Sequence, residues 1–189
     1  MIISKFTDDW RLLIELSVNW PFSQEEVYTA LENEEYFGEG DRTYCHNIKS
    51  PILKTIYDTV MSEAPALLAE MSSHPVFQEK WGLDYADQII NNSSLDCFFV
   101  CDKPGYDTEI HIDCRTQVCT GMLFFNSVDD TDQSTSFCTT HSGDNMLRMS
   151  SEYGTGWYAA NTHDCWHVGA NKTQRKRYAI LFINKLILK

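Results

Sequence analysis

Glu109-Ile110-His111-Ile112-Asp113 is the stretch from which the fold and the candidate site of this chain are read. Apolar and polar residues alternate through it, with isoleucine at every second position. A period of two is typical of a β-strand, in which successive side chains point to opposite faces of the sheet. His111 and Asp113 are therefore predicted to project from one face of a strand, side by side.

An imidazole and a carboxylate in this arrangement supply two of the three ligands of a facial metal triad. Such a triad combines two histidines with one carboxylate and leaves coordination positions open. A His-x-Asp triplet is common, however, and by itself it marks an ordinary polar pair more often than a metal site. The hypothesis of a metal site therefore needs a third ligand from elsewhere in the chain.

The sequence around this stretch predicts a jelly roll. From Leu95 onward the chain reads as short β-type runs separated by turn signals, such as Lys103-Pro104-Gly105. The predicted strands are 97–101, 106–113, 118–125, 135–139, 146–149, 156–160, 166–169 and 177–188. Helices followed by such a series of strands indicate an α+β fold, mainly β, in which the helices pack on one outer face of the sheets.

Residues 1–94 read mainly as a helical supporting part, joined to the strands in a single domain, 1–189. Ser23 and Glu26 match a capping box that opens a helix ending near Glu32. The apolar stretch 12–20 is compatible with a helix or a strand. No catalytic constellation is visible in this part of the chain.

A longer helix is predicted to begin at Ser50-Pro51, with proline at its first helical position. Its apolar stripe continues past Pro65, where we expect an interruption or a kink because proline lacks the backbone donor. A further short helix is predicted at 76–81. His46 and His74 lack a ligand partner at useful spacing and are interpreted as structural.

The composition is that of a folded, acidic protein. The 189 residues are 43% hydrophobic and 13% aromatic, and the formal net charge is −12. This charge argues against binding of duplex nucleic acid or of anionic membranes. The seven cysteines are scattered without a Cys-x-x-Cys pair, which favours reduced thiols over disulfides or a zinc knuckle. No signal-peptide pattern or membrane-length apolar run is present, so a cytoplasmic location is expected.

The histidines downstream of Asp113 are the candidates for the third ligand. His141 lies in a polar, turn-rich stretch and is disfavoured, while His163 and His167 share the segment 161–168. The last predicted strand helps in choosing the third ligand. Its alternation places Arg177 on one face together with apolar residues. A buried arginine requires an anionic partner and binds carboxylates bidentately. Alternatively, Arg177 only continues the solvated basic run 172–176.

The ordered set His111-x-Asp113, Trp166-His167 and Arg177, ten residues after His167, resembles the Fe(II)/2-oxoglutarate-dependent dioxygenases, most closely their prolyl-4-hydroxylase-like branch. The flanking segments 102–106 and 120–126 are also similar to that family. The resemblance covers about 97–183, roughly the second half of the chain.

The resemblance implies a double-stranded β-helix that holds Fe(II) through His111, Asp113 and His167. Arg177 would bind the distal carboxylate of 2-oxoglutarate, and Thr120 would lie near this co-substrate. His163 would be a loop residue or lie just outside the ligand shell. The expected cofactors are Fe(II), 2-oxoglutarate and O₂, with ascorbate in a supporting role.

Two features refine what the resemblance implies. Retention of Asp113 favours hydroxylation, since a small residue there would open a halide site. Phe124 stands where some members carry a tyrosine that helps to bind 2-oxoglutarate, so Arg177 would need help from Thr120 or another polar group.

Two other functions stay open on the sequence: a cupin-like metal-dependent dioxygenase or isomerase without 2-oxoglutarate, and a jelly-roll binding module without catalysis. The substrate is equally open between a peptide side chain, such as proline, a free amino acid and a small metabolite. Arg115 is a candidate for binding an anionic substrate. Tyr106, Trp157 and Trp166 are candidates for the pocket mouth, although aromatic residues in such folds are more often core.

Overall fold

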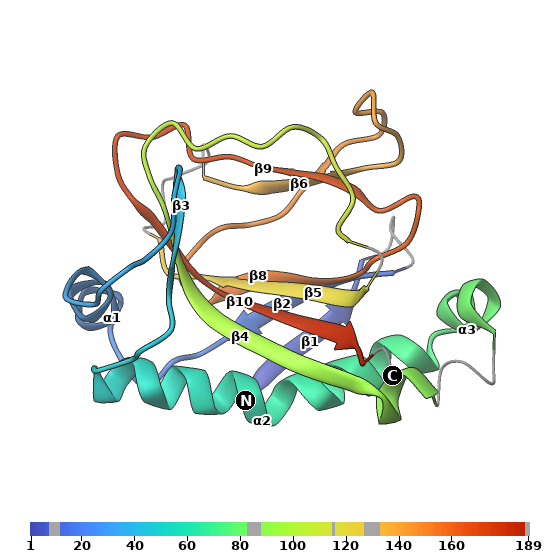
Figure 1. The fold of residues 1–189 in the computed structure, drawn as a ribbon, viewed down its shortest axis with the longest axis horizontal. Coiled ribbons are helices and arrows are strands. Elements are labelled where there is room, and N and C mark those ends of the chain that lie inside the picture. The colour runs from blue at the N-terminus through green and yellow to red at the C-terminus, as the bar shows by residue number, and fades with distance from the viewer. Residues whose placement is uncertain (8–11, 83–87, 115, 127–132, 188–189) are drawn as a thin grey trace.

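The computed structural model describes residues 1–7, 12–82, 88–114, 116–126 and 133–187. Two antiparallel β-sheets face each other, and helices cover the outer face of the larger one (Figure 1). This arrangement is the predicted jelly roll. Arg115, the candidate for anion binding, lies outside the described residues.

The larger sheet has seven strands in the order β1-β2-β8-β5-β10-β4-β3. They are β1 (Ile2–Phe6), β2 (Leu13–Val18), β3 (Arg42–Cys45), β4 (Ser93–Asp102), β5 (Gln117–Phe124), β8 (Thr155–Ala160) and β10 (Arg177–Leu186). The smaller sheet has the order β7-β6-β9, formed by β6 (Thr135–Cys138), β7 (Leu147–Arg148) and β9 (Trp166–Gly169).

The N-terminal part supplies strands as well as helices. The undecided stretch 12–20 forms β2, and the strands β1 and β3, which were not predicted, lie at the two edges of the larger sheet. Each is paired on one side only, and β3 contacts the rest of the sheet through β4. Residues before 94 therefore take part in the sheet that carries the site.

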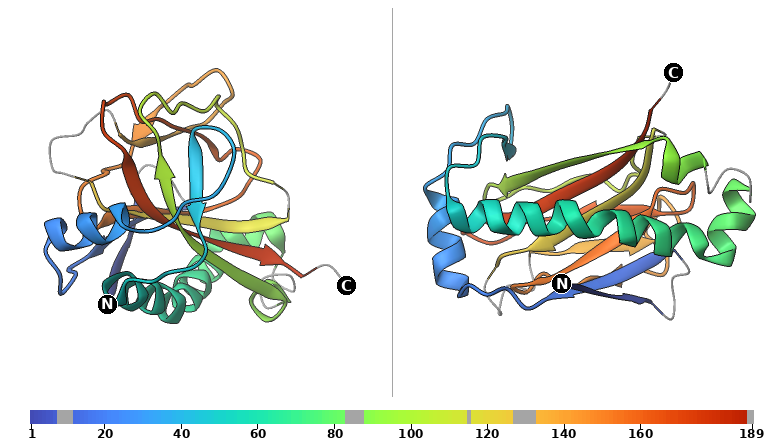
Figure 2. Two further views of the ribbon diagram at one scale, coloured as in Figure 1. Left: turned by 60° about the vertical axis from the view of Figure 1, so that its left-hand side comes forward. Right: turned by 90° about the horizontal axis from the view of Figure 1, so that it is seen from below.

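The helices follow the sequence signals closely. Helix α1 (Gln24–Glu32) begins with the predicted capping box, and α3 (Pro75–Trp81) matches the predicted short helix. Helix α2 (Pro51–Ser73) runs without a break across the outer face of the larger sheet (Figure 2). The interruption expected at Pro65 does not occur, because buried residues on both sides of it, including Val60 and Leu68, keep one apolar face on the sheet. Within the described residues, no helix combines the length and the apolar character that crossing a bilayer requires.

Strand β10 separates two hydrophobic clusters. Its residues Ile180 and Phe182 pack toward the helices, whereas Leu181 and Ile183 point into the space between the sheets. This second cluster also contains Trp157 and comes from both sheets. The alternation that the sequence predicted for this strand is therefore confirmed, with one face on the helices and the other in the jelly-roll interior.

Gly156 on β8 is a position where the sheet leaves no room for a side chain. A Cβ atom there would lie 2.0 Å from the backbone oxygen of Met122 on the neighbouring strand β5. Since a backbone atom cannot rotate away, Gly156→Ala is expected to lower the free energy of unfolding by about 3 kcal/mol. Denaturant unfolding measures this loss. Ser94→Ala, at an exposed position of β4, serves as the control, and equal stability of the two variants would contradict the packing described here.

Candidate metal centre

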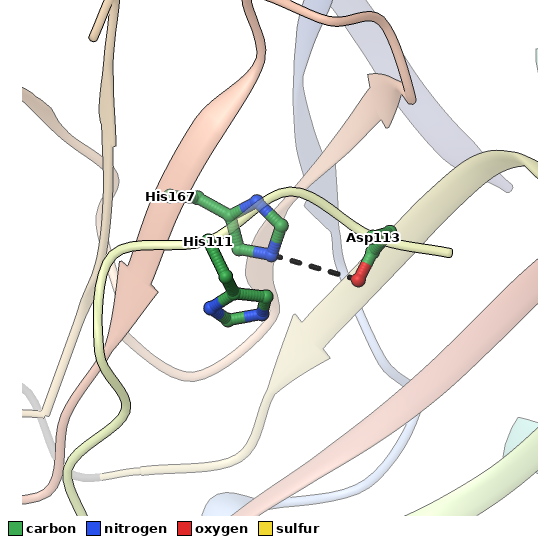
Figure 3. A group of neighbouring side chains, drawn as sticks. All are labelled: His111, Asp113 and His167. Atoms are coloured by element: carbon green, nitrogen blue, oxygen red, sulfur yellow. Dashed lines mark ion pairs between the residues drawn. The ribbon is translucent and has the colours of Figure 1, made fainter. Parts of the chain in front are cut away.

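His111, Asp113 and His167 come together between the two sheets (Figure 3). His167 lies in β9, and the other two lie in the segment that joins β4 to β5. This segment is not the regular strand predicted at 106–113. Among the described residues its β-bridges are isolated ones, Asp107 with Ala170, just past the end of β9, and His111 with His167 in β9.

Backbone hydrogen bonds fix the two histidines opposite each other. The amide of His111 donates to the carbonyl of His167 at 3.0 Å, and the amide of His167 donates back to His111 at 2.8 Å. The two ring centroids are 4.4 Å apart. A reciprocal pair of this kind sets the positions of both imidazoles before any ligand binds.

The three side chains form a ligand set suited to a divalent metal. One ligand atom from each residue lies within 4.8 Å of those of the other two, and all three side chains are half-buried. Nε2 of His167 is 3.8 Å from Oδ1 of Asp113. Two imidazoles and one carboxylate on one side of a cavity are the donor set of non-haem Fe(II) sites.

Hydrogen bonds behind the triad orient each ligand. Nδ1 of His111 lies 2.8 Å from the carbonyl oxygen of Glu109, which selects the tautomer with a free Nε2. Nδ1 of His167 faces the carbonyl of Cys165 in the same way, at 3.4 Å. Thr120 donates to Oδ2 of Asp113 at 2.6 Å. Thr120 therefore supports a candidate ligand, and the register places it opposite Ile183, well along β10 from Arg177.

Burial also prepares His167 for coordination. It lowers the pKa of this imidazole, and the neighbouring His111 acts in the same direction, while the charge of Asp113 opposes them. A lowered pKa keeps the ring neutral near pH 7, and the neutral imidazole is the form that binds a metal.

The triad opens into a cavity of about 200 Å³. Its lining includes Thr120, Met122, Trp157, Arg42 and Tyr106. Trp157 is almost fully buried, with its ring in edge-to-face contact with Phe137. A larger hollow of about 460 Å³ lies beside α1, and no triad residue is among those that line it.

Arg177 is buried at one end of the jelly-roll interior and pairs with Asp102. Strand register explains the contact, because Asp102 on β4 lies directly between Arg177 on β10 and Arg42 on β3. Nε of Arg177 donates to Asp102 at 2.7 Å, and Nε of Arg42 donates to the same carboxylate at 2.5 Å. Burial would raise the pKa of Asp102, but its hydrogen bonds and charge pairs with the two arginines hold that pKa below its ordinary value.

The remaining sequence candidates lie around this site or away from it. Phe124 is buried with its ring under the guanidinium of Arg177, at 5.7 Å. His163 is exposed and is not one of the clustered ligands. The ring of Trp166 contacts His141 and does not line the cavity within the described part of the chain, whereas Tyr106 and Trp157 do line it.

Sequence reasoning missed Arg42 and Asp102. Asp102 stands just before the recognised turn 103–105, but nothing local marks it as the partner of Arg177, 75 residues away in the chain. Arg42 follows a glycine-rich turn in a strand of four residues, too short for its alternation to be read. A buried arginine needs an anionic partner, and this was the one clue that the sequence offered. We interpreted the partner of Arg177 as a ligand, whereas the structure also pairs it with the carboxylate of Asp102.

Neither the scan against protein-family models nor the search of curated proteins gives a match for this sequence. Solved structures do match. A Pseudomonas putida prolyl-4-hydroxylase superposes with a TM-score of 0.60 at 9% identity, covering 87% of this chain and 86% of that one. A viral collagen prolyl hydroxylase from Paramecium bursaria Chlorella virus-1, in complex with 2-oxoglutarate, gives 0.59 at 11% identity, covering 95% and 98%.

A prolyl hydroxylase from Trichoplax adhaerens, bound to a peptide fragment of hypoxia inducible factor, gives a TM-score of 0.62 at 12% identity, covering 94% of this chain and 84% of that one. At such low identities these similarities show a shared fold. The chain therefore has the jelly roll in which these hydroxylases are built, over nearly its whole described length.

Proposed function

We propose that this protein is an Fe(II)- and 2-oxoglutarate-dependent oxygenase that hydroxylates its substrate. The observation that carries the proposal is the triad of His111, Asp113 and His167, preorganised by its hydrogen bonds at the wall of an interior cavity. Its support from the comparisons is a fold shared with 2-oxoglutarate-dependent hydroxylases.

In this proposal the two histidines and Asp113 hold Fe(II) on one side and leave the cavity side open. Together with 2-oxoglutarate and O₂, the iron supplies oxidative decarboxylation to succinate and CO₂, coupled to insertion of an oxygen atom into a substrate C–H bond. Thr120 and the carbonyls of Glu109 and Cys165 keep the ligands in place. Trp157, whose ring lies 6.2 Å from that of His167, and Met122 would make part of the cavity wall apolar and so limit access of water.

The cationic cluster of Arg42, Asp102 and Arg177 supports the assignment of the co-substrate. Two guanidinium groups share one carboxylate, so the cluster carries one positive charge in excess. An excess charge beside a partly apolar cavity favours an anionic ligand, because an uncompensated charge is costly there. The distal carboxylate of 2-oxoglutarate would neutralise it while the 2-oxo acid end reaches the metal.

The size of the cavity favours a substrate presented from outside. At about 200 Å³ the cavity is smaller than a typical small-molecule pocket of roughly 300–1,000 Å³, and it must also hold the co-substrate. The volume left beside bound 2-oxoglutarate would fit one amino-acid side chain better than a whole metabolite. We therefore favour an amino-acid side chain of a peptide or protein, with proline as one candidate.

The function is tested by incubating the purified protein with Fe(II), ascorbate and 2-oxoglutarate and measuring succinate and CO₂. Turnover is expected even without the substrate, at a low uncoupled rate, and both products should form in equal amounts. If the iron-loaded protein neither binds 2-oxoglutarate nor turns it over, the proposal is wrong. A protein that binds iron without 2-oxoglutarate would instead match the cupin-like alternative.

A further inference from the structure

Arg42 and Arg177 flank the same carboxylate but differ in what they face. Arg42 lines the cavity that the metal triad also lines, together with Tyr106. Arg177 is not among the described residues that line this cavity, and its side chain is fully buried. The arginine with access to a ligand is therefore the one on the edge strand β3.

Protein acceptors already use every nitrogen of Arg177. Its Nε and Nη2 both donate to Oδ2 of Asp102. Its Nη1 donates to the carbonyl oxygens of Ala170, at 2.9 Å, and Ser134, at 3.4 Å. Four of its five N–H groups are used in this way, and the fifth, on Nη2, belongs to a side chain with no exposed surface that does not line the cavity, so a ligand could reach it only if the side chain moved.

Arg42 keeps one donor group free. Its Nε and Nη2 donate to Asp102, at 2.5 and 2.9 Å, whereas no described residue accepts a hydrogen bond from its Nη1. The guanidinium lies over the ring of Tyr106, 4.6 Å from the centroid, which fixes its plane. Its side chain is 19% exposed, against 0% for Arg177.

The cluster carries one positive charge in excess, because the two guanidinium groups share the carboxylate of Asp102. Of the two arginines, Arg42 is the one that brings this charge to the cavity wall, since Arg177 and Asp102 have no exposed side-chain surface. An anion entering the cavity would therefore meet Arg42 first and would satisfy its free Nη1.

We infer that Arg42, and not Arg177, contacts the distal carboxylate of 2-oxoglutarate, and that Arg177 is a positioning residue that holds Asp102. This inference rests on the proposed function, since it concerns the ligand of that same cavity. It also assigns a binding residue to the N-terminal part of the chain, outside the segment that carries the sequence resemblance.

The test compares binding of two 2-oxo acids to the protein loaded with Mn(II), which replaces iron so that no turnover occurs. 2-Oxopentanoate has the same carbon chain as 2-oxoglutarate, with a methyl group in place of the distal carboxylate. Calorimetry gives the Kd of each compound for wild type, for Arg42→Gln and for Arg175→Gln. Arg175 is the matched control, because it is an exposed arginine outside this cavity.

Arg42→Gln should fold, because Arg177 still neutralises Asp102. The loss of one charge-assisted hydrogen bond is expected to weaken 2-oxoglutarate binding roughly 10- to 100-fold. The Kd of 2-oxopentanoate should stay almost unchanged, so the preference for 2-oxoglutarate collapses. Arg175→Gln should behave as wild type with both compounds, and thermal melting confirms that each variant is folded.

Unchanged binding of 2-oxoglutarate to Arg42→Gln would overturn the inference, as would an equal loss for both compounds. If this variant does not fold, Arg42→Lys keeps the charge beside Asp102 but lacks the free Nη1, and an undiminished preference for 2-oxoglutarate in it would likewise overturn the inference. A metal-loaded wild type that binds neither compound would overturn the proposed function itself, and the inference with it.

Discussion

Asp113→Ala is expected to abolish stoichiometric binding of Fe(II) and, with it, all decarboxylation of 2-oxoglutarate. Asp113 is the carboxylate of the triad and lies with the two imidazoles as its third candidate ligand. Loss of a hydrogen-bonding partner behind a metal ligand typically costs 10- to 100-fold in metal affinity. Removal of the ligand itself should therefore cost at least about 100-fold. Metal titration under anaerobic conditions measures this loss.

Two further variants make this experiment specific. Thr120→Val removes only the 2.6 Å hydrogen bond to Asp113 and should weaken metal binding by roughly 10-fold, between wild type and Asp113→Ala. His163→Ala is the matched control, an exposed histidine four residues from His167 that is not in the cluster, and it should bind Fe(II) as wild type does. Equal metal binding by Asp113→Ala and His163→Ala would contradict the assignment of the triad.

Arg177→Gln is expected to produce the largest loss of stability of the substitutions considered. It removes the fully buried one of the two arginine partners of Asp102 and the donor to the carbonyls of Ala170 and Ser134. Arg42 still pairs with Asp102 in this variant, but three buried acceptors lose a charged donor, and each buried group left short of a partner costs about 1–3 kcal/mol, so a total of about 3–5 kcal/mol is expected. Denaturant unfolding should show a decrease of this size in the free energy of unfolding, and Arg42→Gln should show a clearly smaller one.

The pH dependence of unfolding provides a second readout of the same pair. Since the pKa of Asp102 is lowered in the folded protein, its pairing stabilises the fold fully above the unfolded-state pKa of about 3.9. This contribution is lost as the pH falls through the lower, folded-state value. The stability difference between wild type and Arg177→Gln should therefore shrink in that acidic range. A difference that is absent at pH 7 would contradict the structural role given to Arg177.

The interior strands of the jelly roll were predictable because their patterning is local. Strand β9 has the predicted bounds, and β10 shows the predicted alternation with Leu181 and Ile183 facing inward. Edge strands β1 and β3 are short or half-exposed and carry little periodic signal, so they were missed. The segment 106–113 looked like a strand, but isolated bridges to β9 are enough to position its histidine.

In the candidate site, too, the residues with a local sequence pattern could be predicted and the others could not. His111, Asp113 and His167 could be selected from spacing and resemblance, and the structure brings them together. The surroundings of Arg177 could not be predicted, since Asp102 and Arg42 reach it only through strand register. Cross-strand neighbours of this kind depend on the pairing of segments far apart in the chain, which no local pattern encodes.

The most direct test of the proposed function is an anaerobic crystal structure of the protein with Fe(II) and 2-oxoglutarate. We expect anomalous scattering from one iron, bound by His111, Asp113 and His167, and chelated by the 2-oxo acid end of the co-substrate. The distal carboxylate should lie against Arg42. An iron bound elsewhere, or a cavity that stays empty at saturating 2-oxoglutarate, would contradict the assignment of this protein as a 2-oxoglutarate-dependent oxygenase.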